Sequence, residues 1–76
     1  MESPVFVLLI DCPDEIGLVF KITGVLYRME VNVIGNQEFV ESENNRFFMR
    51  TTFAGQVNEA EVLRKLRRVQ IGRAHV

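Results

Sequence analysis

The sequence contains few of the residues from which most catalytic and metal sites are built. Its 76 residues include one cysteine, one histidine and no tryptophan. A single cysteine excludes an intramolecular disulfide and any zinc site made of several thiolates, and it fits a reducing compartment. The formal net charge is −1, so the chain lacks the basic excess with which proteins bind nucleic acid through charge.

Long hydrophobic segments are also missing. The longest apolar run, at residues 5–10, is far too short to span a bilayer, and no charged start or cleavage site makes it a signal peptide. Hydrophobic residues nevertheless make up 47% of the chain, which predicts one small globular unit. Chains of this size bury only about 60–65% of their unfolded surface, so a partner or a larger parent protein often completes the core. We expect a soluble cytoplasmic protein with no membrane partner.

The first half of the chain predicts a strand followed by a helix. The unbroken apolar run at residues 5–10 is typical of a central strand buried on both faces. From Ile16 the apolar residues recur at three- and four-residue steps, which predicts an amphipathic helix on the sheet. Gly24 inside this helix predicts close approach to another backbone. The expected apolar stripe consists of Leu18, Val19, Ile22, Val25, Leu26 and Met29.

The second half predicts a hairpin and another helix. Strands at residues 32–40 and 46–53 are joined by ESENN, whose polar residues suit a turn. A helix is expected to begin after Asn58, its cap, with acidic residues in the first turn and basic residues late. In the strand at 46–53, Phe47, Met49, Thr51 and Phe53 alternate with Arg46, Phe48, Arg50 and Thr52, which predicts one apolar and one mixed face.

The resulting order, βαββα, predicts an α+β fold. It is the ferredoxin-like βαββαβ sandwich lacking its last strand, with an antiparallel sheet and two helices on one face. Residues 71–76, IGRAHV, have no amphipathic pattern, and a back-translation of them resembles a widely used sequencing adapter. We therefore predict a truncated domain at residues 1–70 and a non-native tail at 71–76.

The stretch DCPDEIGLVFKIT, residues 11–23, contains the predicted turn from strand to helix. Packing alone explains it if Pro13 fixes φ, Asp14 or Glu15 caps the helix, and Gly17 lets the helix lie tightly on the sheet. Free amides at a helix N-terminus also suit the carboxylate of an amino acid, and Asp14 could then meet its ammonium group. The two interpretations are compatible, and both stay open.

Three stretches, CPDEIGLVFKIT, VNVIGNQEFVE and RFFMRTTFAG, resemble the N-terminal ACT domain of bacterial formyltetrahydrofolate deformylases. The resemblance covers residues 5 to about 70. The run NQEFV followed by RFFMR is the part that is most specific to this family. It implies a larger enzyme in which an ACT regulatory domain precedes a formyltransferase-like domain that hydrolyses 10-formyltetrahydrofolate to tetrahydrofolate and formate. The second domain, which holds the catalytic Asn, His and Asp of this family, is absent from the sequence.

In amino-acid-binding ACT domains the ligand lies between two subunits, so the resemblance implies self-association and a shared effector site. Asn32 is the strongest candidate for an effector-binding residue, because its amide can donate a hydrogen bond to a carboxylate and accept one from an ammonium group. Glycine or methionine is the implied effector, and no cofactor is implied for this segment. The alternative is a non-enzymatic ACT regulator that senses an amino acid. The implied site comprises Asp14, Gly17 and Leu18 on one side and Asn32, Val33 and Ile34 on the other.

Other signals favour no further activity. Cys12 has no base near it in the sequence, and the one histidine, His75, lies in the predicted tail. Three acids around the first turn are too few for calcium, which takes six or more oxygen ligands. The basic run RKLRR spreads around the solvated side of a helix. An RNA-binding sheet is disfavoured because its third-strand glycine is missing. We expect no catalytic residue, no metal and no nucleic acid partner in this segment.

Overall fold

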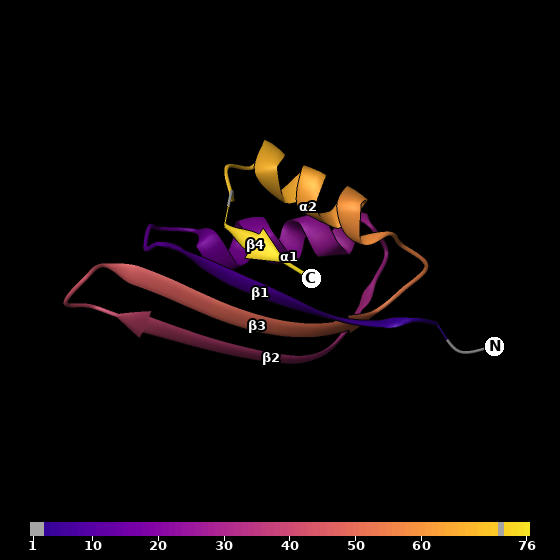
Figure 1. Ribbon diagram of the computed structural model, residues 1–76, viewed down its shortest axis with the longest axis horizontal. Helices are drawn as coiled ribbons and strands as arrows, with labels where there is room; N and C mark the ends of the chain where they lie inside the picture. Colours follow the sequence, from indigo (N-terminus) through magenta and orange to yellow (C-terminus); the bar gives the residue numbers. More distant parts are fainter. Residues whose placement is uncertain (1–2, 72) are drawn as a thin grey trace.

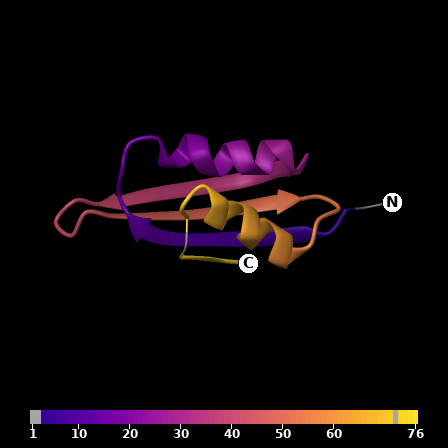
Figure 2. The same cartoon turned by 90° about the horizontal axis from the view of Figure 1, so that it is seen from above.

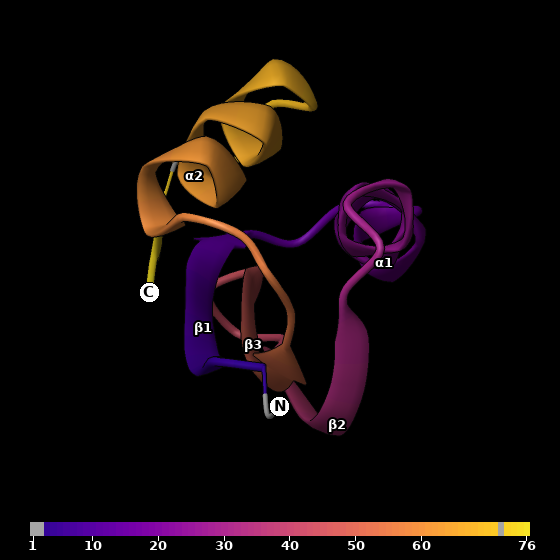
Figure 3. The same ribbon diagram turned by 90° about the vertical axis from the view of Figure 1, so that its right-hand side faces the viewer.

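The computed structural model describes residues 3–71 and 73–76. In the described part of the chain, one sheet with the strand order β2-β3-β1-β4 is antiparallel at each neighbouring pair. Both helices cover the same face of this sheet (Figures 1 and 3). The expected ferredoxin-like α+β sandwich is thereby confirmed. Its elements are β1 Val5–Pro13, α1 Leu18–Arg28, β2 Asn32–Glu41, β3 Arg46–Ala54, α2 Glu59–Arg68 and β4 Ala74–His75.

The expected absence of a last strand needs correction. Residues Ala74 and His75 form a two-residue strand that pairs with Ile10 and Leu9 of β1. Backbone groups at the edge of β1 need hydrogen-bond partners, and any extended segment can supply them whatever its side-chain pattern. Ile71, also in the predicted tail, is 1% exposed and belongs to the core. The non-native origin of residues 71–76 stays a prediction.

β1 is buried on one face, not on both as its apolar run indicated. Leu8, Ile10 and Cys12 are buried, whereas Val5 and Leu9 are exposed. The cause is that both helices lie on one side, so no element among residues 3–71 and 73–76 covers the other face of the sheet (Figure 3). This open face also carries the mixed side chains expected on β3.

The core lies between the sheet and the two helices. Four of the six predicted stripe residues of α1, including Leu18 and Ile22, are buried, but Val19 is 37% exposed. β3 contributes the apolar face that alternation predicted, and the ring of its Phe53 stacks on Phe6 with centroids 5.4 Å apart. The helix after Asn58 is confirmed, because the Asn58 side chain accepts a hydrogen bond from the Glu61 N–H at 2.9 Å.

Three roles that the sequence indicated for α1 and its start are wrong. A Cβ placed on Gly24 would meet only the flexible Arg28 side chain, 3.6 Å away, and no neighbouring backbone. At the start of the helix, neither Asp14 nor Glu15 caps the amides, because Gly17 occupies the N-cap position without a side-chain bond. Gly17 has φ +85° and open space around its Cβ position, so it serves backbone conformation instead of tight packing.

Candidate functional site

The turn between β1 and α1 is fastened to the β2–β3 hairpin. The Asp14 N–H donates to the Asn45 carbonyl at 2.8 Å, and the Asn45 side chain donates to the Asp14 carbonyl at 3.3 Å. Both bonds involve backbone atoms of Asp14, and its half-buried carboxylate takes part in neither. Glu15, the other candidate cap, forms an ion pair with Lys21 at 2.9 Å. Asp14 is therefore the acid at this turn that remains available to a ligand.

The N-terminus of α1 carries amides that no side chain caps. Gly17 precedes the helix, and the first turn contains no acidic residue. The Gly17 carbonyl accepts the first helical bond, from the Lys21 N–H at 2.9 Å. Uncapped amides at a helix start carry partial positive charge and suit an anionic group. Asp14, Gly17 and Leu18 were predicted to meet a ligand here; Gly17 is exposed, whereas the side chain of Leu18 is buried in the core.

The second group of predicted site residues begins β2. Asn32 is exposed, and the exposed fractions of Val33 and Ile34 are 43% and 58%. The pairing of β2 with β3 shifts between Val33 and Gly35, which makes Ile34 the extra residue of a β-bulge. Beside Asn32 lies an open depression of about 690 Å³, whose lining includes Glu30 and Gln56.

Within one chain, the two groups lie at opposite ends of the sheet. Asn32 is paired with Ala54, which is paired with Val5, at one end. At the other end, Pro13 precedes the Asp14 turn and is paired with Arg46. Strands of this length span roughly 25–30 Å, and Figure 2 shows the first turn and the start of β2 at opposite ends of the molecule. A ligand as small as an amino acid cannot touch both groups in one copy.

This architecture agrees with a family comparison. The model of the ACT domain matches residues 6–70. The chain belongs to the ACT domain family. Because the match spans nearly the whole chain, the ACT unit accounts for β1, α1, β2, β3 and α2 together.

The sequence of this ACT domain is similar to the N-terminal region of formyltetrahydrofolate deformylases. It is 48% identical over 61 residues to the formyltetrahydrofolate deformylase of Haemophilus influenzae, covering 80% of this chain and 22% of that protein. The enzyme of the same name from Escherichia coli K12 is 44% identical over 55 residues, covering 72% of this chain and 20% of that protein. The chain thus spans about a fifth of the length of these curated relatives.

Solved structures support the same fold. A crystal structure of formyltetrahydrofolate deformylase from Burkholderia mallei superposes with a TM-score of 0.80 at 24% identity, covering 96% of this chain and 28% of that one. An unknown protein from Galdieria sulphuraria reaches a TM-score of 0.77 at 15% identity, covering 97% of this chain and 42% of that one. At these identities the likeness concerns the fold alone.

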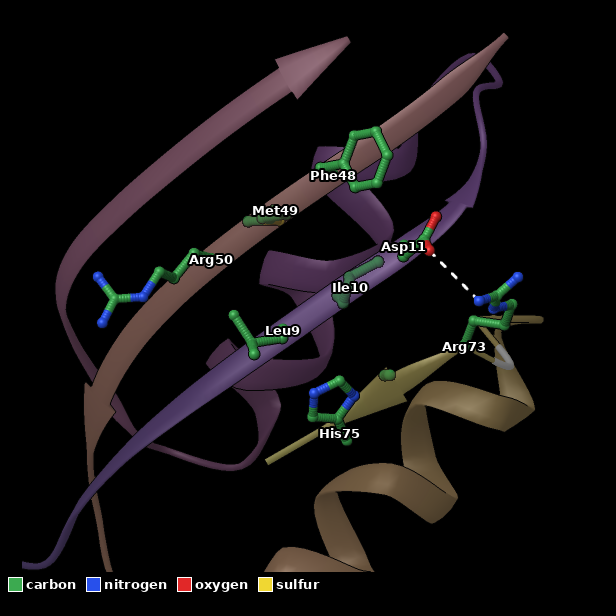
Figure 4. Close-up of a pocket in the computed structure, with 9 residues that line it drawn as sticks. Leu9, Ile10, Asp11, Phe48, Met49, Arg50, Arg73 and His75 are labelled. Carbon is green, nitrogen blue, oxygen red and sulfur yellow. Dashed lines mark ion pairs between the residues drawn. The ribbon is translucent and has the colours of Figure 1, made fainter. Parts of the chain in front are cut away.

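The ACT domain has a second concavity, on its open face, which the sequence did not predict. About 440 Å³ in volume, it is lined by residues of β3, β1 and β4 and by Arg73 just before β4 (Figure 4). Asp11 anchors one side, because its carboxylate pairs with both Arg46 and Arg73, the latter at 3.3 Å. Alternation had placed Arg50 on this face, but Arg73 and His75 could not be placed because residues 71–76 have no periodic pattern. The lining comprises Leu9, Ile10, Asp11, Phe48, Met49, Arg50, Arg73, Ala74 and His75.

Other chemistry has little support in this ACT domain. Burial raises the pKa of the Cys12 thiol, although the nearby Arg46 opposes the shift, so the thiol has little thiolate character. Among residues 3–71 and 73–76 no group of three or more His, Cys, Asp and Glu is arranged to hold a metal ion. No helix in the same residues is long and apolar enough to cross a membrane.

Proposed function

We propose that this ACT domain is the amino-acid-sensing regulatory module of a formyltetrahydrofolate deformylase. The observation that carries the proposal is that the six curated relatives, up to 48% identical, all bear that enzyme name. The parent protein would hydrolyse 10-formyltetrahydrofolate to tetrahydrofolate and formate in the cytoplasm. Catalysis would belong to a domain outside this chain, so the 76-residue chain itself should hydrolyse nothing and need no cofactor.

The effector would be a small amino acid, glycine or methionine. Its carboxylate would accept hydrogen bonds from the amides after Gly17, which no side chain caps. Its ammonium group would meet the Asp14 carboxylate of that copy and the Asn32 amide oxygen of a second copy. The opposite placement of Asp14 and Asn32 in one chain supports a shared site, because only a second copy can bring Asn32 to the Asp14 turn.

Regulation would follow from the shared site. An amino acid bound between two copies favours one arrangement of the ACT pair over others, and the attached catalytic domains follow that arrangement. The coupling free energy between such sites is typically about 1–3 kcal/mol, or roughly 5- to 150-fold in affinity.

Calorimetric titration of the chain with glycine and with methionine tests this proposal. Heat should be released with at least one of them, and Asn32→Ala should weaken binding tenfold or more. Asn44→Ala is the matched control, because it removes the same amide from the exposed hairpin turn and should leave affinity unchanged. A folded chain that binds neither amino acid, or an Asn32→Ala chain that binds as well as wild type, would refute amino-acid sensing at this site.

A further inference from the structure

A groove of about 250 Å³ lies between the two helices, which stand on the same face of the sheet (Figure 3). Its apolar surface comes from Val25 of α1 and from Val69, which directly follows α2. The other three lining residues are Arg28, Lys65 and Arg68. Every charged residue of the lining is therefore a cation, and both helices contribute to the set.

The side chain of Arg28 lies back along α1 instead of extending from the end of the helix. A Cβ placed on Gly24, one turn earlier, would be 3.6 Å from a guanidinium nitrogen of Arg28. Because glycine has no side chain, the guanidinium can lie against this part of the helix, near Val25 and the groove. The neighbour that Gly24 accommodates is thus the Arg28 side chain.

The chain does little to neutralise these cations. Among residues 3–71 and 73–76, neither Arg28 nor Arg68 forms an ion pair. Lys65 lies 4.0 Å from Glu61, and the two side chains are 39% and 43% exposed, so this pair contributes little. Like charges in one groove repel each other. An anion placed among the three cations would relieve that repulsion.

We propose that this groove binds the phosphoryl group of a small organic phosphate. The planar guanidinium of arginine can donate two parallel hydrogen bonds to phosphate oxygens, and lysine adds a compact point charge. A phosphate monoester has three terminal oxygens and about 1.5–2 negative charges at neutral pH, which suits three cations. A carboxylate has only two oxygens and one charge.

The size and the floor of the groove indicate the rest of the ligand. Its volume is below the roughly 300–1,000 Å³ of pockets that enclose drug-sized ligands, so it suits a small molecule. The apolar surface of Val25 and Val69 would contact the organic part of that molecule. A charged group at one end and an apolar group at the other are therefore the features that the groove would recognise.

This groove is distinct from the predicted effector site. Asp14, Gly17 and Asn32 are not among its lining residues. The charge requirement also differs, because three cations would repel the ammonium group of an amino acid. Phosphate binding in the groove does not depend on amino-acid sensing, and either property can fail while the other holds.

Helix dipoles offer a second explanation for the basic residues, since cations are favourable near helix C-termini. Lys65, Arg67 and Arg68 belong to the last turn of α2, and Arg28 belongs to that of α1. Arg67 shares the helix end with Arg68 but does not line the groove. The dipole therefore treats Arg67 and Arg68 alike, whereas phosphate binding requires only Arg68. Arg67 is the matched control.

NMR titration of the full chain with phenyl phosphate tests the site. The amide signals of Val25 and Val69 should shift, and added salt should weaken binding. Arg68→Gln should weaken binding about fivefold or more, because it removes a charge-assisted hydrogen bond, whereas Arg67→Gln should leave affinity nearly unchanged. Both variants should unfold at similar urea concentrations. Benzoate, which has the same ring and a carboxylate, should bind more weakly than phenyl phosphate.

A second pair of variants tests the same site through its nearest acid. Glu61→Gln releases Lys65 from its ion pair and should tighten phenyl phosphate binding about twofold. Glu59→Gln is its control, because it makes the same change of charge in the first turn of α2, away from the groove, and should alter affinity less. Equal tightening in the two variants would mean that binding follows net charge alone, which would overturn the site.

Three further results would overturn the proposal. If the folded chain does not bind phenyl phosphate, or if Arg67→Gln weakens binding as much as Arg68→Gln, the cations serve the helix ends alone. Benzoate that binds as tightly as phenyl phosphate would overturn the choice of phosphate. An acidic peptide that shifts the signals of Val25 and Val69 when phenyl phosphate does not would assign the groove to a protein partner instead.

Discussion

The buried hydroxyl of Thr51 donates a hydrogen bond to the Asn36 side-chain oxygen, with 2.6 Å between the two oxygens. Thr51 lies in β3 and is the one buried polar residue among the described residues, while Asn36 belongs to the exposed strand β2. Asn36 also donates to Glu38 at 2.7 Å. The bond therefore links the core to the edge strand through a polar group that water cannot reach.

Replacing the two partners of this bond should have unequal effects. Asn36→Ala leaves the buried Thr51 hydroxyl without its acceptor and should lower the free energy of unfolding by about 1–3 kcal/mol, whereas Thr51→Val removes the buried polar group itself and should cost less. Urea unfolding of both variants and of the double variant measures this. Adding Thr51→Val to Asn36→Ala should recover stability. A double variant less stable than Asn36→Ala would show that the bond does not act in this way.

Two glycines of the first helical segment should respond to alanine with opposite signs. Gly17 has φ +85°, so Gly17→Ala should destabilise the fold by about 1–2 kcal/mol. Gly24 lies within α1 with only a flexible arginine near its Cβ position, so Gly24→Ala should stabilise by about 0.5–1 kcal/mol. Each variant is the control for the other in thermal or urea unfolding. A destabilising Gly24→Ala would restore the close backbone approach that the sequence had indicated.

The cap of α2 should matter more than an asparagine in the hairpin. The Asn58 side chain accepts from the Glu61 N–H, and losing such a cap costs about 1 kcal/mol, with a range of 0.5–2. Asn58→Ala should therefore lower the urea midpoint, while Asn44→Ala should shift it little. Equal shifts in the two variants would mean that the cap bond adds nothing to stability. Asn58→Asp is expected to retain most of the wild-type value, since aspartate caps equally well.

Much of this fold follows from local patterns. Alternation along β3 correctly assigned its two faces, and the Asn58 cap located the start of α2. The errors concern what local sequence does not contain. The apolar run of β1 does not show that, in the described part of the chain, only one face of the sheet is covered by helices. The short strand β4 pairs through backbone groups, which no side-chain pattern reveals. For the candidate site, the sequence named two groups of residues, but only the strand directions place Asp14 and Asn32 at opposite ends of one chain.

The buried Cys12 thiol predicts how stability changes in alkaline solution. Burial raises the pKa of this thiol in the folded protein, so the unfolded chain loses its proton first as pH rises. The unfolded state then binds fewer protons than the folded state, and the free energy of unfolding must fall with pH. The stability that the protonated Cys12 thiol contributes is fully present below the ordinary thiol pKa, about 8.5. It is lost as pH rises through the higher pKa of the folded protein.

The effect of Cys12 can be isolated by comparison with Cys12→Ala. The variant should be less stable at neutral pH, because it leaves a small cavity beside Ile10 and Phe47. Between pH 8 and 10, however, its free energy of unfolding should fall less steeply than that of wild type, because the variant lacks the one thiol that titrates there. Urea unfolding at several pH values gives the slope of the free energy of unfolding against pH for wild type and for the variant. All other titrating groups are present in both proteins, so the difference between the two slopes reports Cys12. Alkylation of native Cys12 should likewise be slow until urea unfolds the chain. Parallel pH profiles, or rapid alkylation of the folded protein, would mean that the thiol is exposed and its pKa is not raised.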